Sequence, residues 1–250
     1  MVVFLTGASS GIGEALARHY AARGAKLGLV ARRGERLEAL RDSLPGGAET
    51  YIADVRDLGA LQAAAADFLA KHGPPDLVIA NAGISRGTLT EHAADSETFR
   101  HILEVNVLGI VNTFQPFLAP MRKAGRGTLA GVASVAGYRG MPGSGAYSAS
   151  KAAAIRYLES LRVELRGTGL RVATICPGYI ATPMTEKNPY PMPFIIGADD
   201  FARRFARALD AGKDYAVIPW PMAIVARLLA ILPNALFDAA FARAGRKPRD

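Results

Sequence analysis

The chain has 250 residues, of which 50% are hydrophobic and 21% are charged, and its formal net charge is +8. These values exclude a disordered chain and a small disulfide-stapled domain, and they favour a globular protein of one large α/β domain or two small ones. The positive charge suits nucleic acid, an anionic membrane surface or a phosphorylated ligand. No nucleic-acid-binding motif accompanies it, so we expect no nucleic-acid partner.

Short apolar runs alternate with longer helical patterns along most of the chain. Strands are predicted at residues 2–6, 26–31, 49–53, 77–81, 128–134, 171–176 and 215–219. Helices are predicted between them, near residues 13–23, 35–43, 58–72, 97–123, 147–166 and 199–211. The strand runs are almost continuously apolar, which is typical of parallel strands covered on both faces. The alternation predicts an α/β fold with one doubly wound parallel sheet, in a single domain over residues 1–220.

The first predicted strand runs into a glycine-rich loop that opens the first helix. The loop reads TGASSGIG, from Thr6 to Gly13. Glycines allow a tight turn there and let the backbone approach a pyrophosphate at the helix N-terminus. The position between a strand and a helix predicts a dinucleotide-binding, Rossmann-like fold. The candidate cofactor-binding residues of this loop are Gly7, Ser9, Ser10, Gly11, Ile12 and Gly13.

The end of the second strand bears on the choice between NAD and NADP. NAD-binding proteins place an acidic residue there, which accepts a hydrogen bond from the ribose 2′-hydroxyl. In this chain Arg32 and Arg33 follow the strand, and their guanidinium groups can pair with a 2′-phosphate. We therefore expect NADP rather than NAD; the alternative is the solvated start of a helix. Two later strand ends add the candidate cofactor-binding residues Asp54, Val55, Asn81, Ala82 and Gly83.

Several motifs follow one another along the chain. They are TGASSGIG at 6–13, NAG at 81–83, NVLG at 106–109, Ser134, YSASK at 147–151 and PG at 177–178. In order and spacing they resemble the short-chain dehydrogenase/reductase family, over about residues 1–220. The resemblance implies an oxidoreductase that transfers a hydride between NADP and a carbonyl or secondary alcohol. Two alternatives use the same fold: a non-catalytic NADP-binding regulator and a membrane-surface-associated protein.

Tyr147 and Lys151 lie four residues apart, and on a helix such positions share one face. A free tyrosine has a pKa of about 10, and a cation about 4 Å away lowers that pKa by about 3 units. We therefore expect Lys151 to bring the pKa of Tyr147 to about 7, where a general acid/base works in both directions. The alternative is a packed tyrosine beside a lysine that extends into solvent.

The resemblance implies roles for further positions. Ser134 would hydrogen-bond the substrate oxygen, and Asn106 would complete a water-mediated proton relay to Lys151. Lys151 would also bind the nicotinamide ribose, together with Tyr147. The turn after the sixth strand would hold the nicotinamide through Pro177, Gly178, Ile180 and Thr182.

Residues 183–197 contain four prolines and several large apolar side chains, so neither a helix nor a central strand is expected there. Because they follow the nicotinamide-binding turn, we expect a mobile lid that closes over an apolar ketone or alcohol. The alternative is a fixed loop packed on the helix at 199–211. The candidate substrate-binding residues are Ser134, Tyr147, Tyr138, Met141, Met192 and Phe194.

Residues 221–250 predict a helical extension that is broken at Pro233 and ends in basic residues. Its apolar run is shorter than the about 20 residues of a membrane span. We expect it to pack on the domain or on a partner subunit of a homo-oligomer; peripheral membrane contact is the alternative. The single cysteine, Cys176, and the lack of a signal-peptide pattern favour the cytoplasm. The four histidines show no ligand spacing, so no metal site is expected.

Overall fold

Seven parallel strands form the central sheet of the computed structural model, which describes residues 1–249. The strands are β1 (Val2–Thr6), β2 (Lys26–Ala31), β3 (Glu49–Ile52), β4 (Leu77–Ala80), β5 (Gly127–Val132), β6 (Leu170–Pro177) and β9 (Tyr215–Ile218). Their order is β3-β2-β1-β4-β5-β6-β9, and every neighbouring pair is parallel. All seven strands lie where the apolar runs predict them, which confirms the doubly wound fold.

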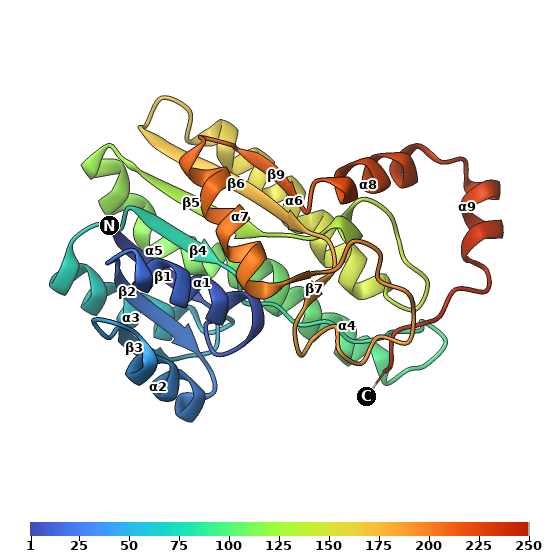
Figure 1. The fold of residues 1–250 in the computed structure, drawn as a ribbon, viewed down its shortest axis with the longest axis horizontal. Coiled ribbons are helices and arrows are strands. Elements are labelled where there is room, and N and C mark those ends of the chain that lie inside the picture. The colour runs from blue at the N-terminus through green and yellow to red at the C-terminus, as the bar shows by residue number, and fades with distance from the viewer. Residues whose placement is uncertain (250) are drawn as a thin grey trace.

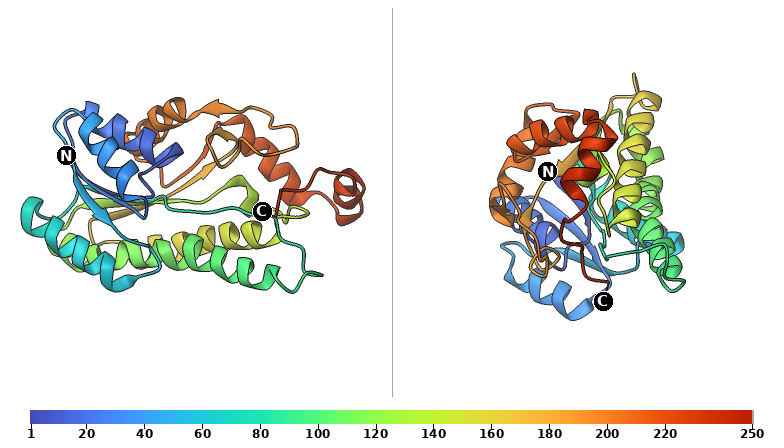
Figure 2. Two further views of the ribbon diagram at one scale, coloured as in Figure 1. Left: turned by 90° about the horizontal axis from the view of Figure 1, so that it is seen from below. Right: turned by 90° about the vertical axis from the view of Figure 1, so that its right-hand side faces the viewer.

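Helices cover both faces of the sheet, as Figures 1 and 2 show. The helices on one face are α1 (Gly11–Ala22), α2 (Gly34–Ser43) and α7 (Ala198–Asp210). Those on the other face are α3 (Leu58–His72), α5 (Gly109–Ala124) and α6 (Gly145–Glu164). Successive strand residues point to opposite faces, so Val3 and Leu5 of β1 join one core cluster and Phe4 joins the other. Burial on both faces explains why the strand sequences are continuously apolar.

The direction in which the chain crosses the sheet reverses beside β1. This strand pairs with β2 on one side and with β4 on the other. In open parallel sheets, ligands bind outside the carboxyl ends of the strands at such a reversal. The glycine loop after β1 and the residues after β4 both lie at this edge, so the fold brings the two predicted cofactor segments together.

The helix predicted at 97–123 is interrupted in the structure. It consists of α4 (Asp95–Leu103), a π-helical turn (Glu104–Leu108) and α5. Isolated π turns within helices are frequent at functional sites, and this one carries Asn106. Taken together with the π turn, the helical run Asp95–Ala124 is long and apolar enough to cross a membrane. Its Phe114 and Phe117 are buried in the core beneath the sheet, so packing accounts for the apolar composition.

The loop of residues 183–197 is closed at its base by a short pair of strands. β7 (Ile180–Ala181) pairs in parallel with β8 (Ile196–Gly197), a contact that the sequence does not indicate. Between them, the loop contains no helix and no strand of the central sheet, as expected. Met184, Phe194 and Ile195 are 41%, 52% and 44% exposed. About half of each of these side chains is therefore open to water, and both the lid and the fixed loop stay predictions.

The C-terminal extension forms two helices, α8 (Pro221–Ile231) and α9 (Asn234–Phe241). They are bent by 118° at the break, which confirms the interruption predicted at Pro233. Arg139 holds the bend: its guanidinium donates to the Leu232 carbonyl at 3.1 Å and to Asn234 Oδ1 at 2.7 Å, and it lies 4.4 Å from the Phe237 ring centroid. Figure 1 shows the pair extending past the sheet, with the final residues returning toward α4.

Candidate active site

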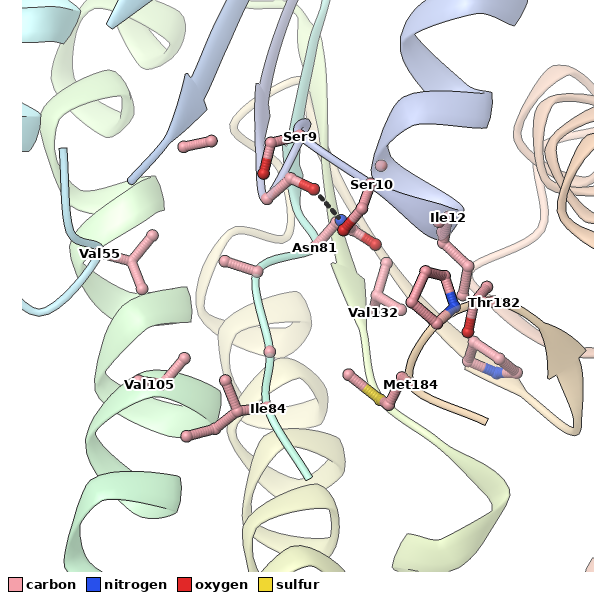
Figure 3. Close-up of a pocket in the computed structure, with 18 of the residues that line it drawn as sticks. Ser9, Ser10, Ile12, Val55, Asn81, Ile84, Val105, Val132, Thr182 and Met184 are labelled. Atoms are coloured by element: carbon pink, nitrogen blue, oxygen red, sulfur yellow. Dashed lines mark hydrogen bonds between the residues drawn. The ribbon is translucent and has the colours of Figure 1, made fainter. Parts of the chain in front are cut away.

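A cavity of about 420 Å³ lies at the carboxyl ends of the central strands. It brings together all the residues predicted to bind the cofactor and three of the four predicted catalytic residues. The predicted residues that line it are Gly7, Ser9, Ser10, Gly11, Ile12, Gly13, Arg32, Arg33, Asp54, Val55, Asn81, Ala82, Gly83, Ser134, Tyr147, Lys151, Pro177, Gly178, Ile180 and Thr182. Figure 3 shows how these segments converge from the glycine loop, β4 and the turn after β6.

The glycine loop has the tight geometry that the approach of a dinucleotide requires. Gly7 and Gly11 adopt φ values of +74° and +56°, which side chains disfavour. A Cβ at Gly13 would lie 2.0 Å from the carbonyl oxygen of Gly7, so no larger residue fits there. Asn81 Nδ2 donates to the carbonyl oxygens of Thr6 and Gly7 at 3.1 and 3.3 Å, which ties β4 to the loop (Figure 3). The loop therefore leaves its backbone open to a pyrophosphate at the start of α1.

Arg33 folds back onto the serines of the glycine loop. Its Nη2 donates to Ser9 Oγ at 2.9 Å and to Ser10 Oγ at 2.7 Å. The pKa of the Arg33 guanidinium is lowered, mainly by burial and to a smaller extent by the positive charges of Arg36 and Arg32. Arg32 has a side chain that is 54% exposed, and its Nη1 lies 3.6 Å from Asp54 Oδ2. Two guanidinium groups and two hydroxyls thus line the end of the cavity beyond β2, where an anionic group finds donors on several sides.

Tyr147 and Lys151 stand one turn apart on α6 and face the cavity. Lys151 is only 4% exposed, so it does not extend into solvent. Its ammonium donates to the Val132 carbonyl at 2.9 Å and lies 5.8 Å from the Tyr147 ring centroid. Ser134 follows β5, and its Oγ accepts from the Ala136 amide at 3.1 Å. The end of β5 and the start of α6 therefore hold the serine, tyrosine and lysine in one wall.

The acidity of this pair differs from the expectation drawn from the sequence. Burial raises the pKa of the Tyr147 phenol, and a hydrogen bond with Ser134 opposes that rise. Burial also lowers the pKa of the Lys151 ammonium to about 8. The expected drop in the Tyr147 pKa is absent because the ammonium is directed at Val132 and both groups are withdrawn from water. The expected lowering of the Tyr147 pKa by Lys151 is therefore wrong for the protein without cofactor.

Asn106 does not line the cavity but lies directly behind it, fully buried. Its Oδ1 accepts from the Ile84 amide at 2.8 Å, and its Nδ2 donates to the Ile84 carbonyl and to Ser150 Oγ, both at 2.9 Å. A Cβ at Gly83 would lie 3.3 Å from Asn106 Oδ1 and 3.5 Å from Lys151 Nζ. Asn106 thus joins the π turn to α6 through Ser150, and Gly83 lies next to both Asn106 and Lys151.

Four predicted substrate residues lie outside this cavity. The Tyr138 hydroxyl pairs with that of Tyr215 at 2.8 Å, and both residues line a second cavity that α6 also borders. The Met141 amide donates to Ser148 Oγ (3.2 Å), Met192 Sδ accepts from the Asn188 side-chain amide (3.4 Å), and Phe194 is half-exposed. Their contact with substrate stays a prediction.

Sequence reasoning did not single out several other residues of the cavity wall, most of them apolar. Most of them adjoin strand ends, where the motif residues already lay, and could have been inferred from that proximity; Val105 instead lies on the π turn. These residues are Val30, Ala31, Ala53, Ile84, Val105, Val132, Ala133, Pro183, Met184 and Thr185.

Residues 1–191 match the family model described as short chain dehydrogenase. The match spans most of the chain and all the motif residues of the cavity. The chain therefore belongs to the short-chain dehydrogenase/reductase family, and it is an NAD(P)-dependent oxidoreductase that acts on an alcohol or carbonyl group.

Individual relatives agree with this assignment. An uncharacterized oxidoreductase of Myxococcus xanthus is 40% identical over 242 residues, which cover 96% of this chain and 95% of that protein. An NADP-dependent 3-hydroxy acid dehydrogenase of Salmonella typhi is 33% identical, over 72% of this chain and 73% of that protein. A short-chain dehydrogenase/reductase structure from Burkholderia phymatum, in complex with NAD, has a TM-score of 0.83 at 25% identity and covers 100% of this chain and 97% of its own.

Proposed function

We propose that the enzyme uses NADP and interconverts an apolar ketone and its secondary alcohol. The observation that carries the proposal is one cavity that holds Arg33 at one end and Ser134, Tyr147 and Lys151 at the other. The first residue suits a 2′-phosphate, and the last three suit proton transfer to a carbonyl oxygen.

The catalytic residues divide the chemistry at the substrate oxygen. NADP, when bound along the glycine loop, supplies the acceptor or donor of the hydride. The Tyr147 phenol donates its proton to the carbonyl oxygen during reduction, and its phenolate takes the alcohol proton during oxidation. The Ser134 hydroxyl donates a hydrogen bond to the same oxygen, and this bond strengthens as negative charge develops there. The Lys151 ammonium stabilises the phenolate electrostatically.

Asn106 acts as a positioning residue in this scheme. Its side chain is saturated by Ile84 and Ser150, and Ser150 Oγ donates to the Tyr147 carbonyl at 2.7 Å. The asparagine thereby fixes the helical turn that carries the tyrosine. Its place beside Gly83, within reach of Lys151, supports the proposed relay of a proton from the lysine toward water.

The choice of NADP rests on charge at the end of β2. No carboxylate directly follows this strand, and Arg33 already bridges Ser9 and Ser10. A 2′-phosphate can replace the serine hydroxyls as the partner of this guanidinium through charge-assisted hydrogen bonds, which are stronger than neutral ones. A ribose 2′-hydroxyl offers no such gain.

An apolar substrate is supported by the wall near the catalytic residues. Ile84, Val105 and Met184 line the cavity, and the loop of residues 183–197 carries exposed apolar side chains beside it. Closure of that loop over an apolar ligand would remove these side chains from water, at about 25 cal/mol per Å². We propose that the loop is a lid that orders with substrate.

A panel of carbonyl compounds tests the proposed function directly. NADPH consumption is followed by absorbance for ketones of increasing apolar area, and NADP⁺ reduction is followed for the matching alcohols. We expect kcat/KM to rise with apolar area. A regulator on the same fold would bind NADPH and turn over no member of the panel, and equal rates for small polar and bulky apolar ketones would contradict the lid.

We further propose that the enzyme is a cytoplasmic homo-oligomer that associates through α8. Trp220, Ile224, Leu228 and Ile231 are 68%, 53%, 58% and 78% exposed, and they recur at helical spacing. A face of this kind on a soluble protein marks an association surface. Contact with an anionic membrane is the alternative, since basic residues follow α9. The buried, unpaired thiol of Cys176 supports a reducing compartment.

A further inference from the structure

The last residues of the described chain, 242–249, form a strap that contacts the loop of residues 183–197 next to the active-site cavity. We call this segment the C-terminal strap. It leaves α9, passes the loop of residues 183–197 and reaches the start of α4, as Figure 1 shows in red. Its Gly245 lies near Tyr190: a Cβ built at that glycine would be 3.4 Å from the Cβ of the tyrosine.

The strap also packs closely against two glycines, Gly87 and Gly143. The Gly87 amide donates to the Pro248 carbonyl at 2.8 Å. A Cβ at Gly87 would lie 2.2 Å from the Lys247 carbonyl oxygen, and one at Gly143 would lie 2.9 Å from the Arg246 Cβ. Both glycines give the strap room that larger residues would fill. The strap is therefore fitted to this site rather than laid loosely over it.

The ammonium group of Lys247 lies where the strap contacts the loop of residues 183–197. Its ammonium donates to the Met184 carbonyl at 3.3 Å, and Met184 lines the active-site cavity. Burial lowers the pKa of Lys247 below its ordinary value. Among residues 1–249 no carboxylate forms an ion pair with it, and the nearby Asp95 is occupied by Arg249. Lys247 is thus a partly desolvated cation with one neutral acceptor at the edge of the cavity.

We propose that Lys247 binds a carboxylate on the substrate, so that the preferred substrates are oxo acids with an apolar body. The carbonyl of such a substrate lies at Tyr147, and its acidic end passes Met184 and meets the strap. A partly buried cation gains most from an anionic partner, because a neutral carbonyl replaces only part of its lost hydration. This inference rests on the proposed function and narrows its substrate class.

The test compares an oxo acid with its methyl ester on the same carbon skeleton, with NADPH, in the full-length enzyme. The variants are Lys247→Gln, Lys247→Glu and Lys247→Arg. Lys213→Gln is the matched control, since this exposed lysine lies just before the amino end of β9, whereas the cavity lies at the carboxyl ends of the strands. We expect Lys247→Gln to reduce kcat/KM for the acid about tenfold, mainly through KM, and for the ester less than about twofold. Lys247→Glu should reverse the preference, and Lys247→Arg should retain it.

A second readout does not depend on turnover. Calorimetry measures binding of a medium-chain carboxylate, and of the matching primary amide, to the enzyme with NADPH. We expect Lys247→Gln to weaken the carboxylate about tenfold and to leave the amide unchanged. An equal loss of kcat/KM for acid and ester, or of affinity for carboxylate and amide, would overturn the inference. It would show that Lys247 only holds the strap in place. Turnover of esters without any preference for acids would overturn it while leaving the proposed function intact; no turnover of any carbonyl would instead reject the proposed function.

Discussion

The guanidinium of Arg249 forms two hydrogen bonds of 2.9 Å with the carboxylate of Asp95, which lies 154 positions earlier in the chain. Asp95 also accepts the Leu89 amide at 2.7 Å. The pKa of the Asp95 carboxyl is held below its ordinary value, mainly by the Arg249 guanidinium and to a smaller extent by the Leu89 amide. One carboxylate therefore fastens both the C-terminal strap and the loop that precedes α4.

Arg249→Gln should release the strap without unfolding the domain. The bidentate pair is partly exposed, so its loss costs little global stability, whereas residues 242–249 lose their attachment. Amide hydrogen exchange should quicken at 85–95 and 242–249 and stay unchanged in the central sheet. Arg243→Gln, at an exposed position near the start of the strap, is the control. Unaltered exchange in both segments would show that the backbone contact at Gly87 is sufficient.

Tyr147→Phe should abolish nearly all turnover and leave NADPH affinity within about twofold, because only the proton donor is lost. Lys151→Ala should impair both turnover and cofactor binding. Ser134→Ala should lower kcat by about 10²-fold, the size expected for one donor to a developing oxyanion. Steady-state kinetics and cofactor titration separate the three outcomes. A Tyr147→Phe variant with most of its activity would exclude the tyrosine as the acid.

Arg33→Ala should reduce kcat/KM with NADPH by about 10- to 100-fold and change it with NADH by less than about threefold. Loss of charge-assisted hydrogen bonds to the 2′-phosphate is the physical reason. Arg41→Ala, at the far end of α2 and paired with Asp42, removes the same charge away from the site. Kinetics with both cofactors give the comparison. A wild-type enzyme that uses NADH and NADPH equally well would contradict the assignment of NADP.

The buried ammonium of Lys151 should make the stability of the cofactor-free enzyme depend on alkaline pH. Its pKa is about 8 in the folded protein, against 10.5 for an ordinary lysine side chain in water. Between these values the unfolded chain binds more protons, so this group raises stability as pH increases. Lys151→Met should therefore be more stable than wild type at pH 7, with the difference shrinking by about 2 kcal/mol near pH 9.5. Urea unfolding of the wild type, Lys151→Met and the exposed control Lys213→Met measures it; a difference independent of pH would reject the buried charge.

The double substitution Leu228→Glu and Ile231→Glu should disrupt the association through α8. Two carboxylates cannot be buried in an apolar contact without a large desolvation cost. Light scattering should give a lower mass than for the wild type, while Ile52→Glu, an exposed position at the end of β3, keeps the wild-type mass. Flotation with anionic vesicles follows in parallel. An unchanged mass together with lost flotation would favour the membrane over a second subunit.

Local sequence patterns sufficed for the fold and for most of the cavity. The strands are buried on both faces, so each appears as an apolar run, and the ligands of a parallel sheet gather at one edge. Gly13 and Lys151 could be identified because their roles depend on neighbours within a few residues. The same reasoning holds for Arg33, which follows its strand directly.

Other features depend on partners that are distant in sequence, and local patterns do not reveal them. The π turn at Asn106 continues an ordinary helical pattern, and its hydrogen bonds to Ile84 and Ser150 cross the fold. Tyr138 follows the catalytic serine closely in the sequence, yet its hydroxyl forms a hydrogen bond with that of Tyr215 on β9. The strap is the extreme case, since Asp95 and Arg249 give no sign of each other in the sequence.

The position of the strap has a practical consequence for anyone who produces this enzyme. An affinity tag fused behind the strap would lie beside the contacts to Asp95 and Gly87 and compete with them. Met1 is half-exposed and precedes β1 at the amino edge of the sheet, away from the catalytic residues (Figure 1). Assays of substrate range are therefore best made on protein purified through a tag on the Met1 side, so that the contacts of the strap are undisturbed.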